Sequence, residues 1–371
     1  MLFRSSVLRE DFPMSKRVLT LDDIESLAVG AWILGTGGGG NPYLPLLNMR
    51  ALYKDGHRVE LMDPADLADD DWVGMAGGMG APLVGQERLP DGRALSRAVA
   101  LMEQHLGQSF AALMSVEIGG GNGVRPLMAA AILKRPIIDA DPMGRAYPEA
   151  QMSSFSIGGV EPGSLAAVDV RGLEAIVHKV PNWKWAERVA RKICIEYGST
   201  ATICKGRTGA QVKQWGIYGT TTKAIAIGQA VREAQRKHED PVAALLAAEP
   251  GKLLYKGKVI DVARRTTDGY LRGVVRFDGM EEFRNSALVI NFQNEWILAL
   301  RDEQPVAMSP DLICVLDSVS GEAVGSETIR YGQRVTVIAL PAPSVYLTPR
   351  GLDHVGPRAF GYDLDFKSVF A

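Results

Sequence analysis

Three acidic residues stand where short apolar segments of the sequence end, and their spacing could support acid–base chemistry. Glu117 ends the segment FAALMSVE, and Asp139 and Asp141 end the segment RPIIDAD. In an extended segment, residues two apart lie on one face at about 6–7 Å, so Asp139 and Asp141 could share a site. Two carboxylates that close raise the pKa of one of them, which provides an acid and a base near neutral pH. We therefore predict Glu117, Asp139 and Asp141 as catalytic residues.

Glycine-rich turns and polar residues follow the same apolar segments. Gly120, Gly121 and Asn122 lie in EIGGGN, just before a predicted helix whose first backbone N–H groups could hold an anion or a developing negative charge. Arg145 could bind an anion through two hydrogen bonds, and Glu149 adds another carboxylate. We predict that these five residues contact the substrate.

A run of four glycines in WILGTGGGGNPY is the most unusual local pattern of the chain. The run consists of Gly37, Gly38, Gly39 and Gly40. Glycine loses more backbone freedom on folding than any other residue, so the run needs a reason. It either lets a ligand approach the backbone, in which case these glycines bind substrate, or it lets two helices meet at a tight corner.

The segments on either side of this run have helical signals. Thr20 is a predicted cap for a helix ending near Leu34, and Asn41 is a predicted cap for a second helix with Pro42 at its first position. A nucleotide-binding glycine loop follows a strand and has a fixed glycine spacing or a Gly-Lys-Ser/Thr ending, neither of which is present. The glycine run is therefore a predicted connection between helices and does not indicate a nucleotide site.

Composition excludes several classes of function. The chain has 371 residues, a formal net charge of −2 and no long run of Lys and Arg, so we expect no nucleic-acid partner. No apolar run approaches the roughly 20 residues that span a bilayer, and we expect no membrane association. Three widely spaced cysteines suit a reducing compartment, which favours a cytoplasmic location. Residues 1–13 lack periodicity and are expected to be either a disordered arm or the result of an upstream translation start.

The sequence contains no pattern typical of a transition-metal site. The five histidines have no HxH or HExxH spacing, and no two cysteines form CxxC. We therefore expect no metal and no cofactor. An ion bound by the carboxylates of Glu117, Asp139 and Asp141 is the alternative. Cys194 and Cys314 are predicted core residues, and Cys204 is also expected to be structural.

The elements that must position these residues alternate in type over the first half of the chain. Buried strands are predicted at 57–62, 71–76, 110–117 and 135–141, with helices at 94–107 and 123–134 between them. This alternation predicts an N-terminal three-layer α/β/α domain, residues 15–165, with a mostly parallel sheet. Ligands bind beyond the carboxyl ends of such strands, which is where the acidic residues and glycine turns lie.

The pattern changes in the second half, residues 166–371. Helical patterns at 183–198 and 220–238 precede short alternating segments rich in turn residues, from about 252 to 347. Strands of this density predict a C-terminal domain that contains a β-barrel, with a sandwich as the alternative.

The quoted motifs resemble those of a known family over nearly the whole chain, from about Leu21 to Phe366. LGTGGGGNPY, GGMGAP, EIGGGNGVRPLMAAA, DADPMGRAYPE, GTTTKAIAIG, PDLI and HVGPRAFGYDLDF are similar to the S-methyl thiohydantoin desulfurase-like family, which is associated with hydantoinase/oxoprolinase proteins. The resemblance implies an N-terminal α/β/α layer domain and a C-terminal domain containing a β-barrel. For some members it also implies loss of sulfur from a thiohydantoin ring.

The resemblance allows a mechanism to be written on the predicted residues. Asp139 or Asp141 would activate water for attack at the ring C2 carbon, with Glu117 as the acid partner, while the turn at Gly121 and Asn122 holds the carbonyl. Arg145 would bind a substrate carboxylate. The expected function is a hydrolase of a small hydantoin- or thiohydantoin-like ring. The alternative is a non-catalytic ligand-binding subunit or partner of a hydantoinase/oxoprolinase complex, and in either case we expect a homo-oligomer.

Overall fold

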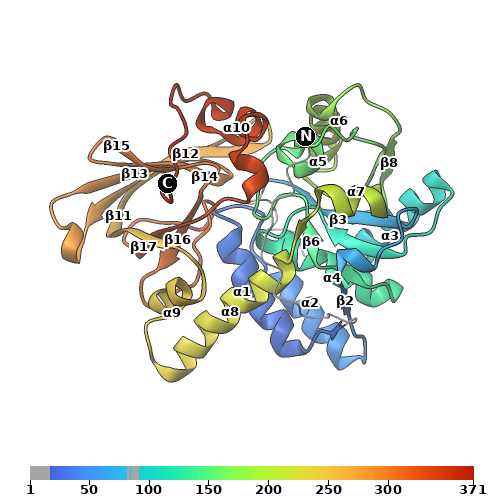
Figure 1. The fold of residues 1–371 in the computed structure, drawn as a ribbon, viewed down its shortest axis with the longest axis horizontal. Coiled ribbons are helices and arrows are strands. Elements are labelled where there is room, and N and C mark those ends of the chain that lie inside the picture. The colour runs from blue at the N-terminus through green and yellow to red at the C-terminus, as the bar shows by residue number, and fades with distance from the viewer. Residues whose placement is uncertain (1–16, 82–83, 85–91) are drawn as a thin grey trace, which may run out of the picture.

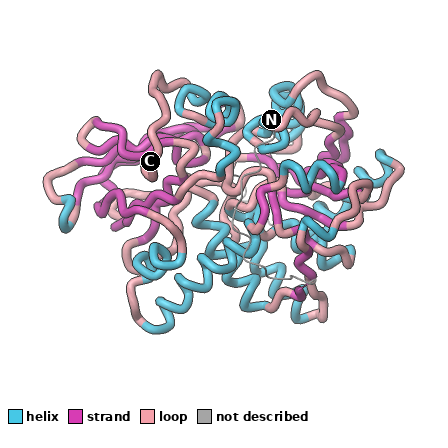
Figure 2. Tube along the Cα trace, viewed as in Figure 1, coloured by secondary structure: helices cyan, strands magenta, loops and turns pink. Residues whose placement is uncertain are grey.

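The computed structural model describes residues 17–81, 84 and 92–371. The prediction made for residues 1–13 lies outside the described residues. Figure 1 shows two regions side by side, one rich in antiparallel strands and one in which helices and strands mix, and Figure 2 shows the same division by element type.

The first region is built on an eight-stranded sheet with the order β1-β2-β5-β4-β3-β9-β7-β8. Its strands are β1 (Arg17–Val18), β2 (Glu60–Met62), β3 (Trp72–Gly80), β4 (Ala112–Ser115), β5 (Ile137–Ile138), β7 (Leu165–Val168), β8 (Glu174–Val177) and β9 (Thr200–Thr208). The strands β2, β5, β4 and β3 are parallel, as the alternating pattern predicted. The pairs β1–β2, β3–β9, β9–β7 and β7–β8 are antiparallel.

The sheet is therefore mixed, and the prediction of a mostly parallel sheet was correct only for its centre. The physical reason is the connectivity, because a short turn joins β7 to β8 and allows only antiparallel pairing. The strand β9 follows the predicted domain boundary at residue 165, yet it pairs with β3 along nine residues of register. The finer three-layer arrangement stays a prediction.

Most helices of this region were expected from the sequence, whereas the two short ones at 154–157 and 209–215 were not predicted. They are α1 (Leu21–Leu34), α2 (Tyr43–Lys54), α3 (Gly92–Leu106), α4 (Arg125–Leu133), α5 (Ser154–Ile157), α6 (Trp183–Glu196), α7 (Gly209–Trp215) and α8 (Thr220–Lys237). Thr20 caps α1 in a reciprocal capping box with Asp23. The helix α2 begins at Tyr43, one residue later than predicted, and the Tyr43 N–H donates to Asn41 Oδ1 at 2.8 Å.

The helices α1 and α8 cross closely although they lie far apart in the sequence. A Cβ at Gly30 would lie 1.8 Å from the Ala224 carbonyl oxygen, and one at Gly228 would lie 1.8 Å from that of Ser26. Only glycine allows backbones to approach this far. The crossing places α8 against the first helix of the chain, as Figure 1 shows. No helix among the described residues is long and apolar enough to cross a bilayer.

The second region is a curled antiparallel sheet of seven strands with the order β15-β14-β13-β12-β11-β17-β16. The strands are β11 (Lys252–Thr267), β12 (Tyr270–Gly279), β13 (Ala287–Gln293), β14 (Glu295–Arg301), β15 (Gln304–Met308), β16 (Leu312–Asp317) and β17 (Arg334–Leu340). This half-barrel agrees in place with the predicted barrel at 252–347 and encloses its own core around Tyr255, Phe277 and Trp296. The remaining helices are α9 (Pro241–Ala248) and α10 (Pro349–Val355).

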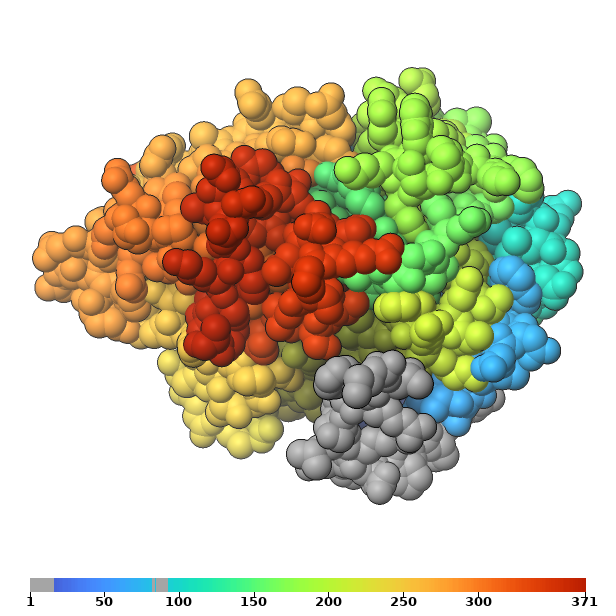
Figure 3. All heavy atoms as spheres, turned by 45° about the horizontal axis from the view of Figure 1, so that its top comes forward, coloured from blue at the N-terminus to red at the C-terminus, as the bar shows by residue number. Residues whose placement is uncertain are grey.

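Two further features complete the fold. The short strands β6 (Ala140–Asp141) and β10 (Ile217–Tyr218) pair with each other beside the first sheet. Figure 3 shows the C-terminal residues (red) lying across the junction between the half-barrel (orange) and the segment around α5 and α6 (green). The two regions also contact each other directly, since the Trp296 N–H donates to the Thr36 carbonyl at 2.7 Å.

Candidate functional site

A cavity of about 550 Å³ opens at the carboxyl ends of β3 and β4. Its wall combines the glycine run, the turn after β4, the loop after β6, parts of α6 and β9, and the tip of the β13–β14 hairpin. The wall therefore draws on both regions of the molecule. This is the edge at which open α/β sheets bind ligands, as the sequence predicted.

Glu117 lies in this wall, two residues after β4. Its side chain is buried and accepts hydrogen bonds from Asn122 Nδ2 at 2.7 Å and from the Tyr147 N–H at 3.1 Å. Burial raises the pKa of Glu117 to about 7, although both hydrogen bonds act in the opposite direction. A carboxyl group with this pKa can accept or donate a proton near neutral pH, which is what a general acid–base residue requires.

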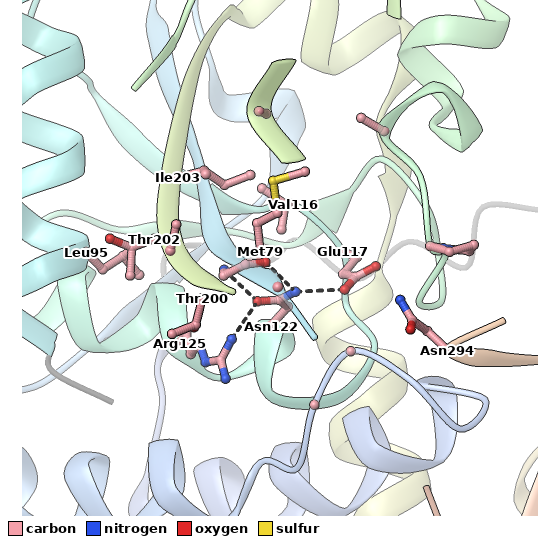
Figure 4. Close-up of a pocket in the computed structure, with 18 of the residues that line it drawn as sticks. Met79, Leu95, Val116, Glu117, Asn122, Arg125, Thr200, Thr202, Ile203 and Asn294 are labelled. Carbon is pink, nitrogen blue, oxygen red and sulfur yellow. Dashed lines mark hydrogen bonds between the residues drawn. The ribbon is translucent and has the colours of Figure 1, made fainter. Parts of the chain in front are cut away.

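Asn122 is held in a fixed orientation by the end of β3. Its Oδ1 accepts the Gly78 N–H at 2.7 Å, and its Nδ2 donates to the Gly78 carbonyl at 3.2 Å and to Glu117. Because both amide atoms have partners, the NH₂ group must point toward Glu117, as Figure 4 shows. Asn122 therefore orients the Glu117 carboxyl group within the cavity.

Arg125 supplies a cation to the same wall at the start of α4. Its Nη1 lies 3.5 Å from Asn122 Oδ1, and among the described residues no carboxylate lies within ion-pair distance of it. Gly78 leaves the space that the guanidinium occupies, since a Cβ there would lie 2.0 Å from Nη1. Burial lowers the pKa of Arg125, while the charge of Glu117 raises it. A half-buried cation that faces a cavity, without a carboxylate partner among the described residues, is suited to an anionic ligand group.

The glycine run contacts the second glycine-rich turn backbone to backbone. The Gly121 N–H donates to the Gly40 carbonyl at 2.6 Å, and a Cβ at Gly39 would lie 2.3 Å from the Gly119 carbonyl oxygen. A Cβ at Gly120 would equally meet the Gly39 and Gly40 backbone. Gly39 and Gly40 also line the cavity, whereas Gly37, Gly38, Gly120 and Gly121 are not among its lining residues. The two turns therefore pack closely against each other. Two of the six predicted glycines, Gly39 and Gly40, line the cavity.

Asp139 and Asp141 lie outside the cavity wall, and each carboxylate is occupied by backbone N–H groups. Asp139 accepts from the N–H groups of Thr221 and Thr222, at 2.9 and 3.0 Å, at the start of α8. Asp141 accepts from Ile118, Met143 and Gly144 and so ties the loop after β6 to the turn after β4. Burial raises the pKa of both groups, that of Asp141 to about 6. These contacts favour a positioning role for both, and their predicted role in catalysis stays a prediction.

Arg145 and Glu149, the last two predicted residues, differ in their placement. Arg145 is fully buried and donates to the carbonyls of Pro310 and Asp311 and to Thr36 Oγ1 at 2.6–3.2 Å, so it joins the two regions and does not face the cavity. Glu149 does line the cavity, where Gln293 Nε2 donates to it at 3.0 Å. Arg125, rather than Arg145, is the arginine positioned for an anionic ligand group.

Several cavity residues were missed by sequence reasoning. Lys205 is buried over the Trp183 ring, 4.5 Å from its centroid, and burial lowers its pKa to about 7. Arg191 and Glu187 form a buried ion pair at 2.7 Å on α6. Glu295 enters from the β13–β14 hairpin. No spacing rule links these residues to Glu117, because they come from remote elements, although Arg125 was visible in the quoted motif EIGGGNGVRP.

Among the described residues, no group of three or more His, Cys, Asp or Glu side chains could hold a metal ion. The three cysteines are buried, and none of them forms a disulfide bond. Burial raises the pKa of Cys204, so its surroundings do not favour a thiolate. The expectation that Cys204 is structural is in agreement with this environment.

Comparison with known proteins places this geometry in a family. The model of the S-Me-THD-like N-terminal domain matches residues 22–179, and that of the S-Me-THD-like C-terminal domain matches residues 181–369. A protein from Chromobacterium violaceum solved by X-ray crystallography has a similar fold, with a TM-score of 0.79 and 23% sequence identity over 95% of this chain and 100% of that one. No curated protein matches the chain. The two domain models together cover nearly the whole sequence, and the chain belongs to the S-Me-THD-like family.

Proposed function

We propose that this protein is a hydrolase that removes sulfur from a small thiohydantoin-like ring, or carries out a related hydrolysis of a hydantoin-like ring, in the cavity at the ends of β3 and β4. Family membership supports the substrate class. The observation that carries the proposal is Glu117, a buried carboxyl group in the cavity wall whose pKa is raised to about 7.

Glu117 would act as the general base for water. In its ionised form it takes a proton from a water molecule while the water oxygen bonds to the ring C2 carbon, and it returns that proton to the ring nitrogen. The C2–S bond then breaks, sulfur leaves as a thiol and C2 becomes a carbonyl. Asn122 serves this step by holding the Glu117 carboxyl group in one orientation.

Arg125 would bind a negatively charged part of the substrate, such as a carboxylate substituent or an ionised ring nitrogen. Its guanidinium faces the cavity without a carboxylate partner among the described residues, so a ligand anion would compensate its charge. Asp139 and Asp141 enter the proposal as positioning residues, because their oxygens already accept several backbone N–H groups.

The test is to incubate the protein with a panel of hydantoins, thiohydantoins and S-methyl thiohydantoins and to follow thiol release or ring opening by mass spectrometry. We expect turnover of at least one member, and Glu117→Gln should lower kcat by about 100-fold or more while the protein stays folded. Arg125→Gln should instead raise KM for substrates with an anionic substituent. Glu322→Gln, the same kind of change at an exposed residue outside the cavity lining, is the matched control and should leave both constants unchanged.

Two outcomes would contradict the proposal. Saturable binding of a ring compound by the wild type, without turnover of any panel member, would support the alternative of a ligand-binding subunit in a hydantoinase-type complex. Equal activity of the wild type and Glu117→Gln would show that Glu117 is not the base.

A further inference from the structure

Glu295 is a second buried carboxyl group in the cavity wall, and the C-terminal region supplies it. It begins β14, directly after the tight turn at Asn294, whose φ is 58°. Only 2% of Glu295 is exposed, and its Oε2 has no hydrogen-bond partner in the structure. A buried carboxylate oxygen without a partner is costly, whereas a protonated carboxyl group avoids that cost and offers a donor to whatever enters the cavity.

The glycine run makes room for this carboxyl group. A Cβ at Gly38 would lie 1.9 Å from Glu295 Oε1, so the position could not carry a larger side chain without moving the carboxyl group. The φ of Gly38 is not in the left-handed region, so backbone conformation does not explain why glycine stands there. Glycine stands there because a larger side chain would occupy the space of the Glu295 carboxyl group.

The hairpin tip that carries Glu295 is fixed against the first region of the molecule. The Trp296 N–H donates to the Thr36 carbonyl at 2.7 Å, and Ser326 Oγ donates to the carbonyls of both Asn294 and Gly37. Figure 4 shows Asn294 on the same side of the cavity as Glu117. The carboxyl group of Glu295 is therefore held at the cavity on the side where Glu117 lies.

The two carboxyl groups are close enough to influence one another. Burial is the main cause that raises the pKa of Glu295 well above its ordinary value, and the charge of Glu117 raises it further. When Glu117 is ionised, Glu295 is therefore expected to keep its proton. One group is then a base and the other an acid at the same pH, as in other paired carboxyl sites.

We propose that Glu295 is the general acid that protonates the departing sulfur, with Glu117 as the base. This inference rests on the proposed function and names a further catalytic residue for it. As the C2–S bond breaks, sulfur takes the bonding electron pair and the Glu295 proton and leaves as the thiol. The C2 hydroxyl loses its own proton as it becomes the carbonyl, and that proton restores the carboxyl group of Glu295.

The need for an acid depends on the leaving group, which provides a sharp test. An alkyl thiol has a pKa like that of cysteine, about 8.5, and leaves poorly as an anion, whereas a nitrophenyl thiol is far more acidic and needs no proton. We compare S-methyl and S-(4-nitrophenyl) thiohydantoins as substrates for the wild type, Glu295→Gln and Glu117→Gln. Glu295→Gln should lose about 100-fold or more in kcat on the S-methyl compound and less than about 5-fold on the S-nitrophenyl compound. Glu117→Gln should lose activity on both.

The pH profile gives a second readout that a structural role would not change. Wild-type kcat on the S-methyl compound should rise as Glu117 ionises and fall at higher pH as Glu295 loses its proton, and the falling limb should be absent in Glu295→Gln. Glu249→Gln is the control, because Glu249 is a partly buried carboxyl group that pairs with Lys223 and is not among the cavity-lining residues. It should keep wild-type kcat on both substrates.

The outcomes separate this inference from the proposed function. If the wild type hydrolyses the S-methyl compound and Glu295→Gln is equally active, or loses activity equally on both leaving groups, Glu295 is not the acid and the hydrolase proposal stands. If the wild type turns over no ring, the proposed function itself fails. Gly38→Ala provides an independent check, since displacement of the Glu295 carboxyl group should reproduce the same dependence on leaving group.

Discussion

At the scale of single residues, the chemistry proposed for the cavity depends on carboxyl groups whose pKa is raised by burial. Glu117 is buried and accepts from two hydrogen-bond donors, whereas Asp141 is fully buried and accepts from three backbone N–H groups. Burial raises the pKa of both groups, to about 7 for Glu117 and about 6 for Asp141. Glu117 lines the cavity and Asp141 does not, so Glu117 is the group positioned to exchange a proton with a ligand.

The raised pKa of Glu117 predicts a pH dependence of stability. Its ordinary value is 4.5, so between about pH 5 and pH 7 the folded state binds more protons than the unfolded state, and stability falls as the pH rises. The contribution from this group amounts to about 3 kcal/mol. Urea denaturation at several pH values should show a smaller fall for Glu117→Gln than for the wild type. Identical slopes for the two proteins would mean that burial does not raise the pKa of Glu117.

Asp141 provides the contrasting prediction. The N–H groups of Ile118, Met143 and Gly144 all reach Asp141 Oδ2, and the Gly144 N–H also reaches Oδ1 at 3.1 Å. Asparagine keeps one acceptor oxygen but sets its NH₂ group against the Gly144 N–H, so Asp141→Asn should lower the free energy of unfolding by about 2 kcal/mol. The measurement is urea denaturation alongside kcat of the folded fraction. Unchanged stability together with a loss of kcat would support the catalytic role that the sequence predicted for Asp141.

At the scale of elements, the glycine-rich turns are explained by close backbone packing and by the side chains they accommodate. Gly39 combines a left-handed φ of +73° with a Cβ position only 2.3 Å from the Gly119 carbonyl oxygen. Gly56, at the end of α2, also has a left-handed φ, +89°, but its Cβ position is open. A comparison of the two glycines therefore distinguishes the energetic cost of a left-handed φ from the cost of a steric clash.

This pair gives a matched prediction. Gly56→Ala should cost about 1–2 kcal/mol of stability, because alanine must adopt the left-handed conformation. Gly39→Ala should cost at least about 2 kcal/mol more, because the two turns must also move apart. Thermal melts of both variants, with and without a bound ring compound, provide the comparison. Equal losses of stability would show that the turns do not pack as closely as described, and a loss of binding alone would favour the ligand-approach alternative for the run.

At the scale of the whole molecule, the site exists only because the half-barrel and the mixed sheet are fixed to each other. Arg145 is central to this junction, since it is fully buried and donates to the carbonyls of Pro310 and Asp311 as well as to Thr36. The packing of α1 against β16 and the hairpin tip at Asn294 add further contacts across the same junction.

Replacement of Arg145 should therefore destabilise the folded protein. Arg145→Met removes the hydrogen bonds to three acceptors that stay buried, and we expect a loss of about 3 kcal/mol or more in the free energy of unfolding. Arg276→Met, at an exposed arginine of β12, is the control and should change stability by less than about 0.5 kcal/mol. Retained stability with weakened binding of carboxylate-bearing rings would instead support the role that the sequence predicted for Arg145.

The sequence by itself determined the local elements and the place of the site along the chain. Hydrophobic periodicity predicted α1, α3, α4 and the parallel strands, because local spacing decides which face of an element is apolar. The position of Glu117 and Asn122 after a buried strand placed them at the sheet edge, where the cavity lies. The resemblance of the motifs to the S-methyl thiohydantoin desulfurase-like family also agreed with the family that the domain models show.

Only the tertiary structure decided which polar residues share the cavity. Asp139 and Asp141 follow the same kind of strand as Glu117, yet their oxygens are taken up by the N-terminus of α8 and by the neighbouring loop. Glu295 lies 178 positions beyond Glu117, and no local pattern relates the two. Burial and the supply of hydrogen-bond donors set the protonation of each carboxyl group, and both depend on contacts between elements remote in sequence.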